Sequence, residues 1–401
     1  MTLRKLPVRS RLPLAVLTAS VICLRCIAGV GIPLPVLSGL CVLLTVLCLS
    51  EKPAVSLPLA AMLGLLLLSL ALHPEPDFPV RAMRMTALTV GLVCFSPLVS
   101  TEALTRVRRV IARTLFTGLS LGVCASFLIW LYLTVTAGTY THTSFSYFGF
   151  TGIFGYGMLL SSVSAVVCIA ATWKFFRAGS RGIALVMAFL AAVSLVCCVA
   201  GGSRMALMAL LLSLAAILLT QRQRLRDLSR KPAFLTAFLL AVILTAVCLP
   251  GATTALRHKI NVSQQHESLF YSRRQLWQTR TDEFLSSPLL GIGFANEFPI
   301  EDPITQRPTG SIEPGSSWLT VLTYGGILTA IPFLWFLWDT VRKLLRRRGR
   351  PEYPLLLALL IFFLLNGVTE GWLFFAGSLM FPLFWLTCAA IQAAPERKDK
   401  Q

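Results

Sequence analysis

GIALVMAFLAAVSLVCCVAGGSRMALMALLLSLAAILLT, residues 182–220, decides the fold class of this chain. It holds two apolar runs, separated only by Gly-Gly-Ser-Arg, and each is close to the roughly 20 residues that a helix needs to cross a membrane. Hydrophobic residues make up 56% of the 401 residues and charged residues 13%, which is more apolar surface than a soluble core of this length buries. The sequence therefore predicts an all-α polytopic membrane protein.

Similar apolar runs recur along the whole chain and predict about 12 transmembrane helices. They lie at residues 12–30, 33–50, 54–73, 84–100, 111–138, 152–172, 182–200, 205–220, 233–250, 317–338, 354–372 and 374–393. The first two runs lie close together and Arg25 lies in the first, so this pair is either two spans or one re-entrant element.

One long polar interval divides the chain into three parts. Residues 1–250 hold the predicted transmembrane helices 1–9, residues 251–316 form a long periplasmic loop, and residues 317–401 hold helices 10–12 and a cytoplasmic tail. A loop of this length indicates a function.

The distribution of positive charge predicts the orientation. With a cytoplasmic N-terminus and twelve spans, 26 of the 36 Lys and Arg residues fall on the inside, as the positive-inside rule expects. Both termini are then cytoplasmic, and the net charge of +19 indicates contact with anionic membrane lipids and not with nucleic acid. The basic, then apolar N-terminus resembles a signal peptide, but Arg25 and the lack of a clear cleavage site favour a retained first helix.

Cysteine and metal chemistry have little support in the sequence. All 11 cysteines fall in or beside apolar runs, which indicates packing and not a disulfide framework. No cluster of His, Cys, Asp or Glu has metal-ligand spacing, and no Ser-His-Asp arrangement can be argued, so we predict neither a metal nor a cofactor.

Within the long polar interval, residues 272–294 read SRRQLWQTRTDEFLSSPLLGIGF. The amphipathic stretch at 267–286 predicts a helix near the membrane surface, Gly291 and Gly293 predict a turn, and the following Pro-rich acidic segment predicts an irregular lid.

At these residues the chain resembles the bacterial O-antigen ligase and polymerase superfamily. The resemblance rests on Arg273, Trp277, Pro288, Leu289, Leu290, Gly291, Gly293 and Phe294. Two further patterns agree with it, Gly201-Gly202-Ser203-Arg204 and Gly325-Gly326-Ile327.

This resemblance implies a GT-C glycosyltransferase in the bacterial inner membrane. It implies an undecaprenyl-diphosphate-linked glycan as donor, used at the periplasmic face, and no nucleotide sugar. The acceptor is the lipid A-core for a ligase, or a second lipid-linked glycan for a repeat-unit polymerase. The single long outside loop favours a ligase. A non-catalytic transporter of lipid-linked glycans is the alternative from another class, since twelve spans also suit one.

Arginines are the expected diphosphate ligands, because a guanidinium holds phosphate oxygens bidentately and stays charged. Arg204, at the outer end of the eighth run, either binds diphosphate or reaches toward lipid headgroups. Arg273 matches the family arginine by its spacing from Trp277, and Arg274 is the alternative one residue on. Arg280 is either a phosphate contact or a solvated residue, and we favour the solvated residue.

A general base is also needed to take the proton of the acceptor hydroxyl. The resemblance implies a histidine shortly before the tenth span, but the chain has glycine there, at Gly315, and this departure favours a polymerase. Glu313 is our first substitute and His266 the second. The other residues considered are His142, His258, Glu297, Glu301 and Asp302. Glu370, near the outer end of the eleventh run, pairs with Arg204 or Arg273, orients the acceptor, acts as the base, or is merely interfacial.

Overall fold

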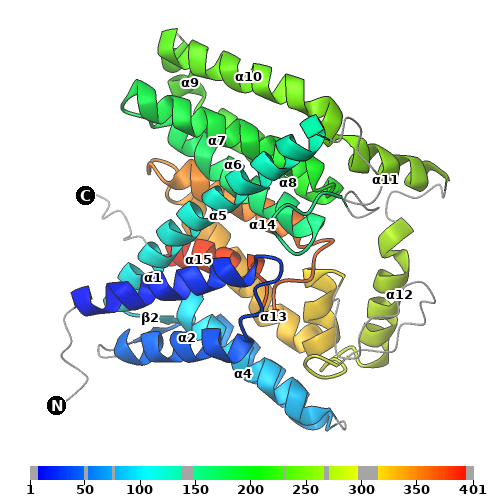
Figure 1. The fold of residues 1–401 in the computed structure, drawn as a ribbon. Coiled ribbons are helices and arrows are strands. Elements are labelled where there is room, and N and C mark those ends of the chain that lie inside the picture. The colour runs from blue at the N-terminus through cyan, green and yellow to red at the C-terminus, as the bar shows by residue number, and fades with distance from the viewer. Residues whose placement is uncertain are drawn as a thin grey trace.

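The computed structural model describes residues 8–48, 53–74, 77–136, 149–229, 232–265, 271–296 and 315–393, and almost all regular structure in them is helical (Figure 1). The helices are α1 (Val8–Arg25), α2 (Leu34–Cys48), α3 (Leu57–Leu72), α4 (Phe78–Phe95), α5 (Glu102–Thr136), α6 (Gly157–Phe176), α7 (Arg181–Ala200), α8 (Arg204–Thr220), α9 (Arg222–Ser229), α10 (Pro232–Ala252), α11 (Thr254–Gln265), α12 (Tyr271–Ser286), α13 (Ser317–Leu345), α14 (Tyr353–Asn366) and α15 (Met380–Ala393). Two short strands, β1 (Ala54–Val55) and β2 (Val99–Ser100), pair antiparallel.

The predicted apolar runs coincide with helices, since each of the twelve overlaps one. By length and composition five of the described helices can cross a membrane, namely α4, α5, α6, α7 and α13. Six further apolar segments are shorter: α2, α3, α8, Phe238–Leu249 within α10, α14 and α15. These helices fit a polytopic membrane protein, and the number of twelve spans stays a prediction.

Large apolar side chains face outward on several of these helices. Val135 is 73% exposed, Leu219 76% and Val247 74%. Side chains of this kind, repeated along long apolar helices, fit a surface that lies against lipid.

The long polar interval is more helical than the sequence predicts. The helix expected at 267–286 begins at Tyr271 and is α12. A second helix in the interval, α11, and the short α9 were not predicted. The lid expected in 297–314 lies outside the described residues. Figure 1 shows α11 and α12 on the same side of the helical body.

Helix α6 lies at the centre of the body, and most of its residues are buried. It packs against α7, α8 and α14. Hydrogen bonds described below connect the N-terminal ends of α6 and α8 with the C-terminal end of α14, so these three helix ends lie together. The candidate site forms around them.

Candidate functional site

The Gly-Gly-Ser-Arg turn fixes the first residue of α8. A Cβ on Gly201 would lie 2.4 Å from Ser161 Oγ, so only glycine lets the turn pack against α6. Gly202 has φ of +73°, a conformation that glycine adopts without strain. The Ser203 amide donates to Ser161 Oγ at 3.2 Å, and Ser203 caps α8. Arg204 therefore begins a helix at a defined place, where the helix dipole also favours an anion.

Arg273, in the first turn of α12, forms an ion pair with Glu370. Arg273 Nη2 lies 3.2 Å from Glu370 Oε1, and the two side chains are 11% and 18% exposed. The same nitrogen lies 3.4 Å from Met158 Sδ, in the first turn of α6. The neighbouring Arg274 is exposed. Of the two predicted arginines, Arg273 is the one that the fold brings to Glu370.

The turn that carries Glu370 is held on the start of α13. The Glu370 carbonyl oxygen accepts from the Ser317 hydroxyl at 2.6 Å and from the Ser317 amide at 3.1 Å. Asn366 is fully buried at the end of α14, where its Oδ1 accepts from Trp372 Nε1 at 3.1 Å and its Nδ2 donates to Ser162 Oγ at 3.3 Å. These bonds fix the backbone on both sides of Glu370, so its carboxylate is held near α12.

Lys259 is a further cation of this site, and sequence reasoning missed it. Its Nζ donates to the Gly202 carbonyl at 2.9 Å, which ties α11 to the turn before Arg204. Burial lowers the pKa of the Lys259 ammonium to about 8; the charges of Arg204 and Arg273 also lower it, and Glu370 raises it. The four side chains therefore share one electrostatic environment. A lysine in a polar loop carries no sequence signal of its own, and the contact with Gly202 became evident only in the structure.

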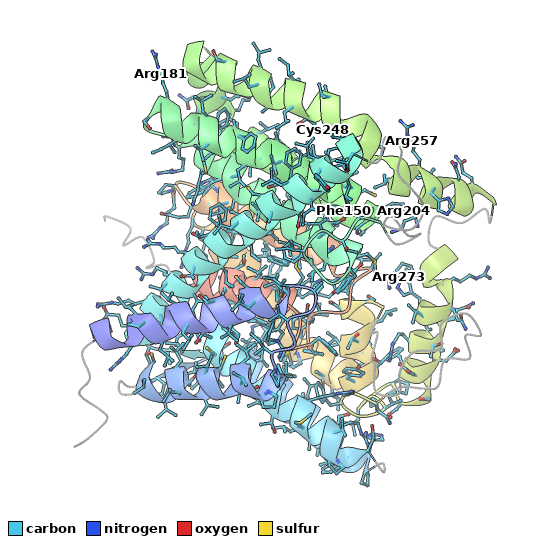
Figure 2. All side chains as sticks on the ribbon, viewed as in Figure 1. Phe150, Arg181, Arg204, Cys248, Arg257 and Arg273 are labelled. Atoms are coloured by element: carbon cyan, nitrogen blue, oxygen red, sulfur yellow. The ribbon has the colours of Figure 1, made fainter. Side chains whose placement is uncertain are left out.

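We call the cluster of Arg204, Lys259, Arg273 and Glu370 the cation site. Because it holds three cations and one carboxylate, it has an excess of positive charge. Its members come from α8, α11, α12 and the turn between α14 and α15. Figure 2 shows Arg204 and Arg273 on the same side of the molecule, near α11 and α12. An arrangement of this kind attracts an anion with several phosphate oxygens.

The motif loop, residues 288–294, inserts into a break in α13. Gly326 has φ of +64°, and the helix ladder is interrupted there. The amides of Ile327 and Leu328 donate instead to the carbonyls of Pro288 (2.8 Å) and Leu289 (3.2 Å). In an unbroken helix these amides would donate to the carbonyls of Thr323 and Tyr324. Those two carbonyls accept hydrogen bonds from other parts of the protein.

These two freed acceptors are satisfied by the motif loop and by α3. The Thr323 carbonyl accepts from the Ile292 amide at 2.8 Å, and the Tyr324 carbonyl accepts from the Ser69 hydroxyl at 2.8 Å. The Leu290 carbonyl lies 2.6 Å from the same Ser69 hydroxyl, so the two carbonyls share its single hydrogen. Since these two amides and two carbonyls have partners outside the helix ladder, the interruption can persist in an apolar setting.

The predicted turn at Gly291 and Gly293 is present, and it explains both glycines. They have φ of +73° and +103°. A Cβ on Gly291 would lie 2.4 Å from the Thr323 carbonyl oxygen, and one on Gly293 would lie 2.9 Å from His73 Cβ. Arg81, which is fully buried and paired with Asp77 just before α4, also lies close to Gly293. Gly291 thus packs the loop against α13, and Gly293 packs it against the C-terminal end of α3 and against α4.

Arg280 is not the solvated residue that we expected. Its side chain is 1% exposed, and its Nη1 lies 2.7 Å from Glu283 Oε2, which is also buried. The spacing of three residues places both on one face of α12, toward the protein. This ion pair favours a structural role for Arg280.

The position of the family histidine is unsuited to a side chain. Gly315 has φ of +67°, and a Cβ there would lie 3.1 Å from Leu276 Cβ. Its carbonyl accepts from Trp277 Nε1 at 3.2 Å, so the motif tryptophan anchors α12 to the start of α13 through this glycine. Of the other predicted bases, His258 is exposed on α11. The remaining ones, His142, His266, Glu297, Glu301, Asp302 and Glu313, lie outside the described residues.

Known proteins provide a comparison for one segment of the chain. The described residues hold no group of three His, Cys, Asp or Glu side chains that could bind a metal ion. No curated protein matches the sequence. The family model described as O-antigen ligase matches residues 188–334, the segment that holds Arg204, α12 and the motif loop, and it confirms the resemblance to the O-antigen ligase and polymerase superfamily.

Proposed function

We propose that this protein is an O-antigen ligase-like glycosyltransferase that moves a glycan from undecaprenyl diphosphate to an acceptor hydroxyl. The observation that carries the proposal is the cation site, in which Arg204, Lys259 and Arg273, all within the matched family segment, share one electrostatic environment with Glu370, the ion-pair partner of Arg273. The family consists of glycosyltransferase-like enzymes of lipid-linked glycans. By the positive-inside prediction the site faces the periplasm of a bacterial inner membrane, with both termini in the cytoplasm.

The proposed chemistry follows from the charges. The bond between the sugar C1 and the donor phosphate oxygen breaks, and the acceptor oxygen forms a new bond to C1. The leaving undecaprenyl diphosphate keeps the electron pair and gains one negative charge. Arg204, Arg273 and Lys259 stabilise that charge through hydrogen bonds to phosphate oxygens. Because the charge grows as the bond breaks, these contacts are stronger in the transition state than in the bound donor.

The acceptor proton needs a destination, and Glu370 is the described carboxylate that lies against Arg273. In the empty site Glu370 pairs with the cation that the donor diphosphate would use. We infer that the diphosphate displaces Glu370 from Arg273, which leaves the carboxylate free to accept the hydroxyl proton. Glu313 and His266 stay as alternative bases.

The test uses the purified protein in proteoliposomes with a lipid-linked glycan donor and a lipid A-core acceptor. Arg204→Ala and Arg273→Ala should each reduce transfer by about 100-fold or more, as for loss of other transition-state donors. Arg274→Ala is the matched control and should keep transfer within about twofold, because Arg274 is the exposed neighbour. Undiminished transfer in both Arg204→Ala and Arg273→Ala would overturn the proposal that the cation site binds the donor diphosphate, and absence of transfer by the unmodified protein would overturn the enzymatic proposal. If the protein were a transporter, the variants would lose movement of the lipid-linked glycan across the membrane. Glycan transfer from donor already on the outer face would not depend on them.

A repeat-unit polymerase is the second candidate, and the glycine at 315 in place of a histidine favours it. The glycolipids of a deletion strain distinguish the two. Long chains left on the carrier lipid indicate loss of a ligase, whereas single repeats attached to the lipid A-core indicate loss of a polymerase.

A further inference from the structure

A second cationic feature lies in a pocket of about 590 Å³ formed by three separate parts of the chain. Arg177 follows α6, Arg224 lies on α9, and Arg348 and Arg350 lie in the connection from α13 to α14. Among the described residues that line this pocket there are four arginines and no Asp or Glu. We call it the arginine pocket.

The arginine pocket lies at the opposite end of the helical body from the cation site. Helix α6 runs from Met158, beside Arg273, toward Arg177. Helix α8 runs from Arg204 to Thr220, which lines the pocket. These helices have 20 and 17 residues, which correspond to about 30 Å and 25 Å at a rise of about 1.5 Å per residue. That separation is close to the thickness of a hydrocarbon core. Figure 1 likewise shows α9 and α11 at opposite ends of the helical body.

One wall of the pocket is fixed by polar and aromatic contacts. The Pro351 carbonyl accepts from Trp173 Nε1 at 3.1 Å and from Arg177 Nη1 at 3.3 Å. The Arg177 guanidinium carbon lies 5.5 Å from the centre of the Trp173 ring, within the range of a cation–π contact. These contacts join the end of α6 to the connection before α14, where Arg348 and Arg350 lie. The cations therefore converge on a shaped pocket, unlike basic residues scattered along flexible loops.

The surroundings determine the class of ligand. Several guanidinium groups, with no carboxylate among the described lining residues, suit a phosphate group, whose oxygens they can hold bidentately. The pocket lies at the end of apolar helices, at the depth of a lipid headgroup, and basic pockets between transmembrane helices bind headgroups of anionic lipids. We propose that the arginine pocket binds the phosphate group of an anionic phospholipid at the membrane face opposite the cation site.

The test compares two double variants that remove the same charge. Arg224→Gln with Arg348→Gln removes two arginines of the pocket. Arg222→Gln with Arg346→Gln removes two arginines that lie two residues away on the same segments and do not line it. Binding of a short-chain phosphatidylglycerol to the purified protein in neutral detergent is measured by native mass spectrometry, with phosphatidylcholine as the uncharged comparison. Thermal unfolding of both variants shows whether they are folded.

Each arginine near an anionic lipid contributes about a fivefold change in affinity, so the pocket variant should weaken phosphatidylglycerol binding by about 25-fold. The matched variant should change it by less than about threefold, and phosphatidylcholine binding should not depend on either. Equal weakening in both variants would overturn the proposal, because it would mean that general surface charge attracts the lipid. Inorganic phosphate is measured in parallel. If inorganic phosphate binds through the same arginines but more weakly than phosphatidylglycerol, the result supports a lipid as the ligand. If inorganic phosphate binds as tightly as the lipid, the proposal of a lipid ligand is overturned.

Discussion

Replacing Lys259 should change how transfer depends on pH. The pKa of this ammonium is lowered to about 8 by burial and by Arg204 and Arg273. The group is charged below that pKa and loses its charge as the pH rises through it. The titration of a group in the free enzyme appears in the pH dependence of kcat/KM, which is measured at limiting donor. It is about 90% protonated at pH 7 and about 10% protonated at pH 9.

The size of the effect follows from the contact that is lost. A hydrogen bond to a charged group is worth about 1.5–3 kcal/mol, and the half-buried position of Lys259 favours the lower end, which is about tenfold in donor affinity. Weighting the charged and neutral forms by their populations gives a fall of about fivefold in kcat/KM between pH 7 and pH 9.

Two variants separate the charge of Lys259 from its anchoring of α11. Lys259→Arg stays charged, so its kcat/KM should stay level from pH 7 to pH 9. Lys259→Gln keeps a donor for the Gly202 carbonyl but no charge, so it should lose about tenfold at pH 7 and show no further fall. Initial rates at limiting lipid-linked donor, with the same liposomes at each pH, measure both. A Lys259→Arg enzyme that falls about fivefold like the unmodified protein would refute the reasoning.

Three further substitutions test the packing beneath the site. Arg280→Met should destabilise the protein by about 3–5 kcal/mol because it removes the cation that pairs with the buried Glu283 carboxylate, and adding Glu283→Leu should restore much of the loss in detergent thermal unfolding. Gly326→Ala should abolish transfer by displacing the motif loop, whereas Gly64→Ala, in open space on α3, should leave transfer unchanged; equal effects would contradict the proposed role of the break. Gly315→His should lower transfer as much as Gly315→Ala does, through strain at positive φ, and a faster histidine variant would show that this position can supply the base.

The sequence predicts the helices better than it predicts the site. Long apolar runs have few alternatives to helices in a membrane, and each of the twelve runs overlaps a helix. Lys259 is a site residue that the sequence did not predict, because its place in the site depends on a hydrogen bond to the Gly202 carbonyl, 57 residues earlier. The same limit affected Arg280. Its spacing from Glu283 was visible in the sequence, but which face of α12 meets the protein was not.

The sequence shows where its glycine pairs lie, but it does not show which residues contact the backbone at these positions. In the sequence, Gly325-Gly326 counted only toward the family resemblance, and the structure shows that α13 is interrupted at Gly326. The carbonyl of Tyr324 at the break accepts from Ser69, a residue of α3 that has no distinguishing pattern. Hydrogen-bond satisfaction required some donor there, but the identity of the donor depends on which helix packs against α13.

The charge of the cation site explains why a carboxylate belongs in it even if its first role is to bind an anion. Three neighbouring cations repel one another, and partial burial strengthens the repulsion, as the lowered pKa of Lys259 reflects. Glu370 offsets part of it while the site is empty. A bound diphosphate would supply about two negative charges near neutral pH and would make that compensation unnecessary. On the proposed function, the contact between Arg273 and Glu370 would therefore be weakest when the donor is bound, at the stage when the acceptor hydroxyl needs a carboxylate to take its proton.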